Sequence, residues 1–319
     1  MLETFVHAYR RTGADPPFGD PRGHHGVAME GYFWRLSDPA SGRVIVALTG
    51  VSRDARGGAW ATAALAAHPA GIVRTAVAPE ADADPRRLAV RAGALLRADE
   101  ESLEVDLGED AWLRARFEAR AGWPRRALGG VGLGHLVPGL GQYWHPHMLD
   151  AQVSGEAQLG GRRLSLTGMR AYAEKNWTPY AHGFPSQWWW GQAHGFDEDG
   201  ACVAFAGGRL LGMHAGAIVV RVDGELVHAV SPPAPMRVRG GAHGWRVQAR
   251  TARDVVTLEG EADGAPYRLP VPVPRERRAE PDVSAMHLAG RLRVQVRRGR
   301  RVRFQGTSRL AGLERGGAG

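Results

Sequence analysis

The residues best suited to chemistry are concentrated between Pro138 and His194. Five of the ten tryptophans fall in this stretch, together with four histidines and the ionisable pair Glu174 and Lys175. Indole rings bring a large apolar area and an electron-rich face, so their clustering beside titratable groups is typical of a pocket for an apolar ligand. A single tryptophan is more often a core residue. For the stretch as a whole we predict a ligand pocket.

The segment Tyr172–Trp177 would place its side chains on two walls if it is extended. Side chains alternate between the faces of a strand, so Glu174 and Asn176 share one face while Lys175 and Trp177 share the other. A carboxyl group among indoles is poorly solvated, which raises its pKa and lets it hold a proton near pH 7. The spacing equally allows an ordinary surface ion pair between Glu174 and Lys175.

The run of three tryptophans further along the chain follows the same alternation. Trp188 and Trp190 would share a face with Gln192, and Trp189 would face the opposite way. One wall of the predicted pocket could then hold two indoles, an amide and an ionisable carboxyl group.

Histidines are the other titratable groups of the stretch. His145 and His147 could ligate a metal together with a carboxylate such as Asp150, but no His-x-x-x-His helix or His-x-Glu pattern accompanies them. We therefore predict no metal centre and keep both histidines as candidate proton donors. Gly-x-Ser-x-Gly is absent and no lysine follows the glycine-rich residues 129–134, so neither a hydrolase triad nor a nucleotide loop is indicated.

The composition limits the class of protein. The 319 residues are 44% apolar, which is enough for a core, and the formal charge of +8 favours anionic partners or membrane surfaces in general terms. Cys202 is the only cysteine, which excludes an intramolecular disulfide. No apolar run approaches the roughly 18 residues of a membrane span, and residues 1–11 lack the apolar core of a signal peptide. We expect a cytoplasmic protein that could contact the inner face of the membrane peripherally.

The arginine-rich C-terminal segments could be a nucleic-acid footprint. However, the arginines of residues 291–304 largely alternate with apolar residues, which is typical of the solvated face of a strand. No recognition module accompanies them, so we predict no nucleic-acid partner.

Short alternating segments separated by glycine-rich turns must position the candidate residues. Strands are predicted over 30–36, 44–48, 103–107 and 112–117, and Asp223-Gly224 and residues 298–301 predict hairpin turns. Residues 1–28 are expected to be irregular, and residues 59–67 are compatible with a short helix. The pattern predicts an all-β fold, barrel or sandwich, with few short helices. The glycine-rich residues 129–134 are the best candidate for a boundary between domains. This boundary predicts one β domain over 1–134 and a second over 135–319, which carries the tryptophan-rich motif.

The sequence resembles the tocopherol cyclase family in several segments that occur in the same order. The central resemblance is Glu174-Lys-Asn-Trp177, followed by Gly183-Phe-Pro and Trp188-x-Trp190-x-Gln192. The N-terminal Glu30-Gly-Tyr-Phe33 and the C-terminal segments 263–270 and 307–314 are also similar. The chain departs from the family pattern after Trp177, where Thr-Pro-Tyr-Ala-His182 replaces the usual glycines.

This resemblance implies two lipocalin-like β domains, related to carotenoid hydratase-type proteins, and ring closure of a prenylated hydroquinone to a chromanol. Protonation of a trisubstituted alkene gives a tertiary carbocation, which the phenol oxygen of the same molecule traps in a dry, aromatic pocket. No metal, nicotinamide or other cofactor is needed. The catalytic candidates are Glu174, His145, His147 and Asn176, and the substrate-binding candidates are Glu30, Trp144, Trp177, Phe184, Trp188, Trp190 and Gln192.

Two other functions remain open from the sequence. Water could replace the phenol as nucleophile, which would make the protein an isoprenoid or carotenoid hydratase. A lipocalin-like carrier would bind a quinone or another hydrophobic ligand without catalysis. An acid that faces the tryptophan wall favours either enzyme, and a wall without a buried acid favours the carrier.

Overall fold

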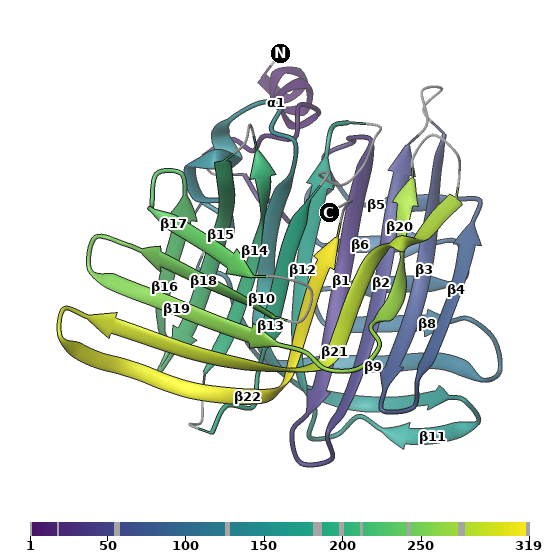
Figure 1. Cartoon of the computed structure of the whole chain (residues 1–319). Helices are drawn as coiled ribbons and strands as arrows, with labels where there is room; N and C mark the ends of the chain where they lie inside the picture. Colours follow the sequence, from purple (N-terminus) through teal and green to yellow (C-terminus); the bar gives the residue numbers. More distant parts are fainter. Residues whose placement is uncertain are drawn as a thin grey trace. The chain divides into compact units, whose positions relative to one another are not determined.

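The computed structural model describes residues 2–17, 19–53, 58–124, 128–180, 187–197, 201–210, 213–240, 244–273 and 278–316. It is 66% strand and 5% helix and contains two antiparallel, barrel-like sheets (Figure 1), which confirms the predicted all-β, two-domain fold. No helix among the described residues is long and apolar enough to cross a membrane.

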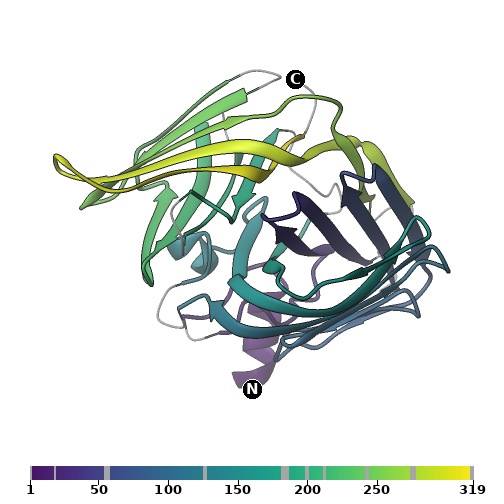
Figure 2. The same cartoon turned by 90° about the horizontal axis from the view of Figure 1, so that it is seen from below.

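The first sheet has twelve strands in the order β4-β3-β2-β1-β12-β10-β9-β8-β7-β6-β5, with β11 paired to β10. Near one edge, β3 contacts β5 and β6 from the other edge, so the sheet curls round on itself (Figure 2). Its strands are β1 (Met29–Asp38), β2 (Arg43–Arg53), β3 (Ala59–His68), β4 (Ile72–Ala78), β5 (Ala81–Ala83), β6 (Ala89–Ala92), β7 (Leu96–Asp99), β8 (Ser102–Asp106), β9 (Ala111–Gly122), β10 (Tyr143–Leu159), β11 (Arg162–Ser165) and β12 (Arg170–Thr178).

The second sheet has ten strands in the order β16-β15-β14-β13-β22-β21-β19-β18-β17, with β20 paired to β21. Here β15 contacts β17, so this sheet also curls. Its strands are β13 (Trp188–Ala193), β14 (Cys202–Leu210), β15 (Met213–Val222), β16 (Glu225–Ser231), β17 (Met236–Gly240), β18 (Gly244–Arg250), β19 (Asp254–Glu261), β20 (Tyr267–Val273), β21 (Arg278–Arg298) and β22 (Arg301–Gly316).

The chain divides into two compact units that are not simple halves of the sequence. Unit 1 comprises Met1–Leu36, Ile45–Phe184 and Leu269–Val283, and unit 2 comprises Ser37–Val44, Pro185–Arg268 and Ser284–Gly319. The joint predicted at residues 129–134 lies inside unit 1, between β9 and β10. These two strands pair directly, for example Val153 with Phe117, so the glycine-rich segment connects neighbouring strands of one sheet.

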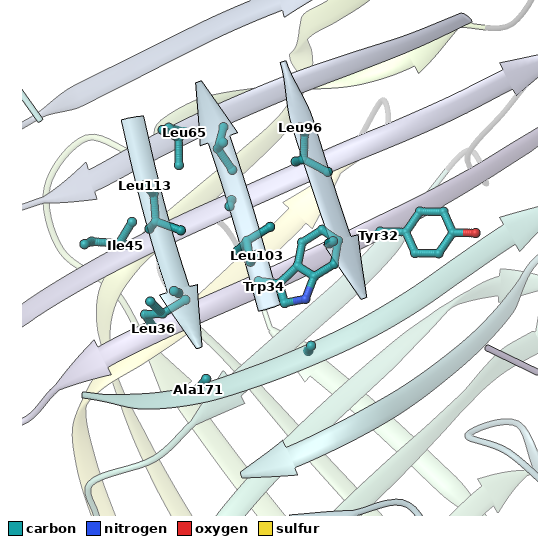
Figure 3. Close-up of a cluster of buried hydrophobic side chains, with 14 of the residues drawn as sticks. Tyr32, Trp34, Leu36, Ile45, Leu65, Leu96, Leu103, Leu113 and Ala171 are labelled. Carbon is teal, nitrogen blue, oxygen red and sulfur yellow. The ribbon is translucent and has the colours of Figure 1, made fainter. Parts of the chain in front are cut away.

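Alternation along the strands builds the core of unit 1. On β8 and β9 the buried Leu103 and Leu113 alternate with exposed Glu104 and Arg114. Figure 3 shows leucines from β3, β7, β8 and β9 gathered near Trp34 of β1. Apolar side chains on one face of each strand are thereby removed from water, which is the main favourable contribution to folding.

Two N-terminal elements differ from the sequence prediction. Leu2–Arg10 forms helix α1 instead of an irregular segment; it contains no glycine or proline, and Glu3 and Arg10 suit the charges of its two ends. The alanine-rich segment 59–67 is strand β3, paired with β4 and almost wholly buried, so sheet packing overrides the helix preference of alanine. The hairpin at Asp223-Gly224 is confirmed, with φ of 49° and 78°.

Candidate functional site

The N-terminal motif at Glu30 and the central motif at residues 174–177 meet on neighbouring strands, β1 and β12. Lys175 Nζ lies 2.7 Å from Glu30 Oε2, and both side chains are almost completely buried. Lys175 also donates to the Gly23 carbonyl at 2.7 Å. The ion pair that the spacing allowed between Lys175 and Glu174 at the surface is therefore replaced by a buried pair with Glu30.

The Glu30 carboxylate is strongly stabilised in its ionised form. Its oxygens accept the backbone N–H groups of His25 at 3.1 Å and Gly26 at 3.0 Å, and the His24 ring lies at 3.2 Å. Burial by itself would raise the pKa of Glu30, but the Lys175 ammonium and these neighbours hold that pKa well below its usual value. Burial lowers the pKa of Lys175, and the Glu30 charge opposes that shift.

Trp177 lies on the same face of β12 as Lys175 and anchors the N-terminal segment. Its indole N–H donates to the Gly13 carbonyl at 2.7 Å, and its ring stacks with His25 at 4.3 Å and with Tyr143 at 5.4 Å. His25 Nε2 in turn lies 2.9 Å from Asp15. Trp177 is thus part of a buried, charged network in unit 1.

The two candidate histidines are buried near this network. Burial and the neighbouring His135 and His147 hold the pKa of His145 well below its usual value. Burial, assisted by the charge of Arg22, lowers the pKa of His147 to about 3. Both rings are therefore neutral at pH 7, which makes them poor proton donors. Among the described residues no group of three or more His, Cys, Asp or Glu side chains is arranged to hold a metal ion.

Glu174 lies on the opposite face of β12, with Asn176, as the alternation predicts. Its Oε2 accepts the Trp144 indole N–H at 2.7 Å and the Tyr172 hydroxyl at 2.5 Å. The buried carboxyl group is held in one orientation by two donors, which suits a group that must meet a ligand in a defined geometry.

Asn176 explains why a glycine follows Glu30 on β1. A Cβ added to Gly31 would lie 2.8 Å from Asn176 Oδ1, so a larger residue there would require this amide to shift. Gln142 donates to the same Oδ1 at 3.3 Å. The residues Glu30-Gly31 and Lys175-Asn176 therefore fit one another on both faces of the two neighbouring strands.

Trp188, Trp190 and Gln192 belong to unit 2 and lie on one buried face of β13. Trp189 points to the other face, where it packs against the core of unit 2, as predicted. Gln192 Nε2 lies 3.3 Å from His194 Nδ1. Phe184, the remaining predicted contact, lies outside the described residues.

Glu314 is a candidate that the sequence reasoning did not select. It lies on β22 directly across from Trp190, and its Oε1 accepts the Trp188 indole N–H at 2.7 Å. Burial raises the pKa of Glu314, and hydrogen bonds from Trp188 and Ser284 only partly oppose that shift. The sequence feature that could have indicated Glu314 is its position as a single acidic residue directly after the apolar run Leu310-Ala-Gly-Leu313.

The family assignment follows from a comparison of the sequence with known families. The model described as Tocopherol cyclase-like matches residues 110–317, well over half of the chain. The chain belongs to the tocopherol cyclase-like family. In this tocopherol cyclase-like protein the match includes Glu174, Trp188 and Glu314 and begins after Glu30.

Solved structures of similar fold support the two-barrel architecture of this family member. CghA with Sch210972 has a TM-score of 0.59 at 13% identity, and the match covers 92% of this chain and 89% of that one. A putative AttH from Nitrosomonas europaea has a TM-score of 0.53 at 14% identity, with 94% and 95% covered. Kievitone hydratase from Nectria haematococca has a TM-score of 0.51 at 10% identity, with 90% and 89% covered. At these identities the likeness establishes the fold.

Proposed function

We propose that the protein is an acid-catalysed cyclase that closes a prenylated hydroquinone to a chromanol. Membership of the tocopherol cyclase-like family supports the reaction class. The observation that carries the proposal is the Glu174 carboxyl group, buried on β12 and oriented by Trp144 and Tyr172. A buried, oriented carboxyl group is the kind of group that general acid catalysis requires.

The proposed reaction begins with a proton on the Glu174 carboxyl group. The proton moves to one carbon of the prenyl double bond, whose π electrons form the new C–H bond and leave a tertiary cation on the other carbon. The phenol oxygen then attacks the cation and forms the C–O bond, and its proton returns to the carboxylate. The product is an isomer of the substrate, so no other reactant is consumed.

The neighbouring residues have distinct proposed roles. The electron-rich face of Trp144, next to Glu174, would stabilise the cation, and Asn176 would orient the phenol. We assign the ring to Trp144 instead of Trp177, because Trp177 lies on the other face of β12, where it stacks with His25 and Tyr143. His145 and His147 are neutral at pH 7 and are assigned no donor role. Trp188, Trp190 and Gln192 belong to unit 2 and are assigned no role in this reaction.

Glu174→Gln tests the proposal, because it keeps the shape of the side chain and removes the acidic proton. A general acid typically contributes about a hundred- to ten-thousand-fold in rate. We expect the variant to fold and to cyclise a prenylated hydroquinone slower by that factor, with the chromanol separated from its isomeric substrate by liquid chromatography and measured in the presence of a chelator. The matched control is Glu118→Gln, on the exposed face of β9, which should leave the rate unchanged. Turnover of Glu174→Gln at the wild-type rate would contradict the assignment.

Hydration of an isoprenoid double bond is the alternative, since kievitone hydratase shares the fold. The first step would be the same protonation, and water would then attack the cation. Incorporation of oxygen from labelled water into the product would identify hydration, whereas a chromanol without the label identifies cyclisation. Binding without turnover of any prenylated phenol would instead indicate a carrier.

A further inference from the structure

Glu314 is held in unit 2 through only one of its two carboxyl oxygens. Oε1 accepts the indole N–H of Trp188 on β13 at 2.7 Å and the hydroxyl of Ser284 on β21 at 2.9 Å. β13 and β21 flank β22 on its two sides, so the carboxyl group is fixed from both directions. Oε2 receives no hydrogen bond from the residues that the structure describes, and the Glu314 side chain is only partly buried.

The face around Glu314 contains no cation among the described residues. Its cross-strand partners are Trp190 on β13 and Met286 on β21. The nearby basic residues belong to the other face, since Arg315 is in register with Trp189, and His287 is in register with the core residue Leu313. Without a counter-charge, desolvation favours the neutral acid. The raised pKa of Glu314 agrees with this environment.

A neutral Glu314 would present a hydrogen-bond donor beside two indoles. Because Oε1 already accepts two hydrogen bonds, the proton resides on Oε2, which is the oxygen without a partner among the described residues. A protonated carboxyl group in an apolar setting can donate to a carbonyl oxygen, which an ionised one cannot. The indoles of Trp188 and Trp190, both largely buried, make the surroundings of this carboxyl group apolar.

We propose that Glu314, Trp188 and Trp190 form a ligand site on unit 2 that binds a prenylated quinone, with the Glu314 carboxylic acid donating a hydrogen bond to a ring carbonyl. The choice of a prenylated quinone rests on the proposed function, because this quinone is the oxidised form of the proposed substrate. The site itself uses residues of unit 2 alone and requires no turnover.

Infrared spectroscopy of the full chain without ligand tests the protonation state. At a pH above 4.5, where an ordinary glutamate is ionised, we expect the carbonyl band of a protonated carboxylic acid in the wild type, weaker in Glu314→Gln and unchanged in the exposed control Glu118→Gln. Absence of the band from the wild-type protein, or a band of equal intensity in the wild type and Glu314→Gln, would overturn the proposal. Neither result depends on cyclase activity, so this test is separate from that of the proposed function.

Titration with a prenylated p-benzoquinone, followed by tryptophan fluorescence, tests the ligand. As the pH rises through the pKa of Glu314, the donor is lost, and we expect the wild-type affinity to fall by about tenfold. Glu314→Gln should bind at every pH, because its amide accepts from Trp188 and Ser284 and presents N–H in place of O–H. The control Glu118→Gln, on the exposed face of β9, should behave as the wild type. The same pH-dependent loss in Glu314→Gln, or equal pH dependence for an isoprenoid hydrocarbon without oxygen, would overturn the proposal.

Discussion

Glu30 in unit 1 and Glu314 in unit 2 are two glutamates in poorly solvated settings whose pKa values shift in opposite directions. Glu30 faces the Lys175 ammonium at 2.7 Å, and its pKa is held well below the usual value. Glu314 faces an indole N–H and a hydroxyl group, and its pKa is raised. Desolvation acts on both carboxyl groups in the same direction, so the presence of a cation decides the sign.

Glu30 is a structural carboxylate, whereas Glu314 is an acid that remains available for chemistry. The Glu30 charge is matched by Lys175 and by backbone donors from His25 and Gly26, which together fasten the N-terminal segment to β12. A carboxylate held in this way gives little opportunity for proton transfer. Glu314 and Glu174 each accept an indole N–H instead, and they are the better candidates for work on a ligand.

Lys175→Met should have the largest effect on stability, because it removes the cation that distinguishes Glu30 from Glu314. Removing one partner of a buried ion pair typically destabilises a protein by about 3–5 kcal/mol. We expect a loss of that size in the free energy of unfolding, measured by urea denaturation. The double variant Glu30→Gln/Lys175→Met should lose less than Lys175→Met alone. Equal losses would show that the two charges are not coupled.

Gly316→Ala should disturb the support of Glu314 in unit 2. A Cβ at this position would overlap the rigid indole of Trp188, which donates its N–H to Glu314, so the ring must shift. Overpacking of this kind costs about 1–3 kcal/mol in the free energy of unfolding. Gly31→Ala in unit 1 is the matched variant, because its Cβ meets only the Asn176 amide at 2.8 Å. We expect a smaller loss for Gly31→Ala, and the reverse order would contradict this reading of the two sites.

The pH dependence of stability should have opposite signs at the two glutamates. The folded-state pKa of Glu30 is lowered, so its contribution is present above the ordinary value of 4.5 and is lost as the pH falls through the lowered pKa. The folded-state pKa of Glu314 is raised, so its contribution is present below 4.5 and is lost as the pH rises through the raised pKa.

Unfolding free energies measured against pH check these signs. The wild type should lose stability relative to Glu314→Gln as the pH rises above 4.5. Relative to Glu30→Gln, the wild type should gain stability as the pH rises from the lowered pKa of Glu30 to 4.5. Parallel curves for the wild type and either variant would show that the corresponding glutamate does not titrate as described.

Ser284→Ala should have the smallest effect and sharpens the account of Glu314. It removes one of the two hydrogen bonds to Oε1, which is worth about 1 kcal/mol. Because this bond opposes the rise in pKa, its loss should raise the pKa of Glu314 further. The infrared band of the protonated acid should then persist to higher pH than in the wild type. A shift of the band's midpoint to lower pH would contradict this expectation.

The sequence alone determined the class of fold and the faces of the key strands. Alternation with a period of two is a local property, so the order of residues along each strand is enough to place Glu174 with Asn176 and Trp188 with Trp190. The Asp223-Gly224 hairpin is also predictable from local sequence, since glycine and aspartate adopt positive φ with little strain. The resemblance of Glu30-Gly31 and residues 174–177 to one family indicated that these segments matter, but not that they touch.

Only the tertiary structure decided which groups meet and which charges they carry. The partner of Lys175 is Glu30 instead of the adjacent Glu174, because β1 and β12 are neighbours although they lie far apart in the sequence. The raised pKa of Glu314 likewise depends on β13 and β21 bringing an indole and a hydroxyl group to it, with no cation on that face among the described residues. A pKa depends on burial and on distances to other charges, and in a sheet protein those distances are fixed by non-local strand pairing.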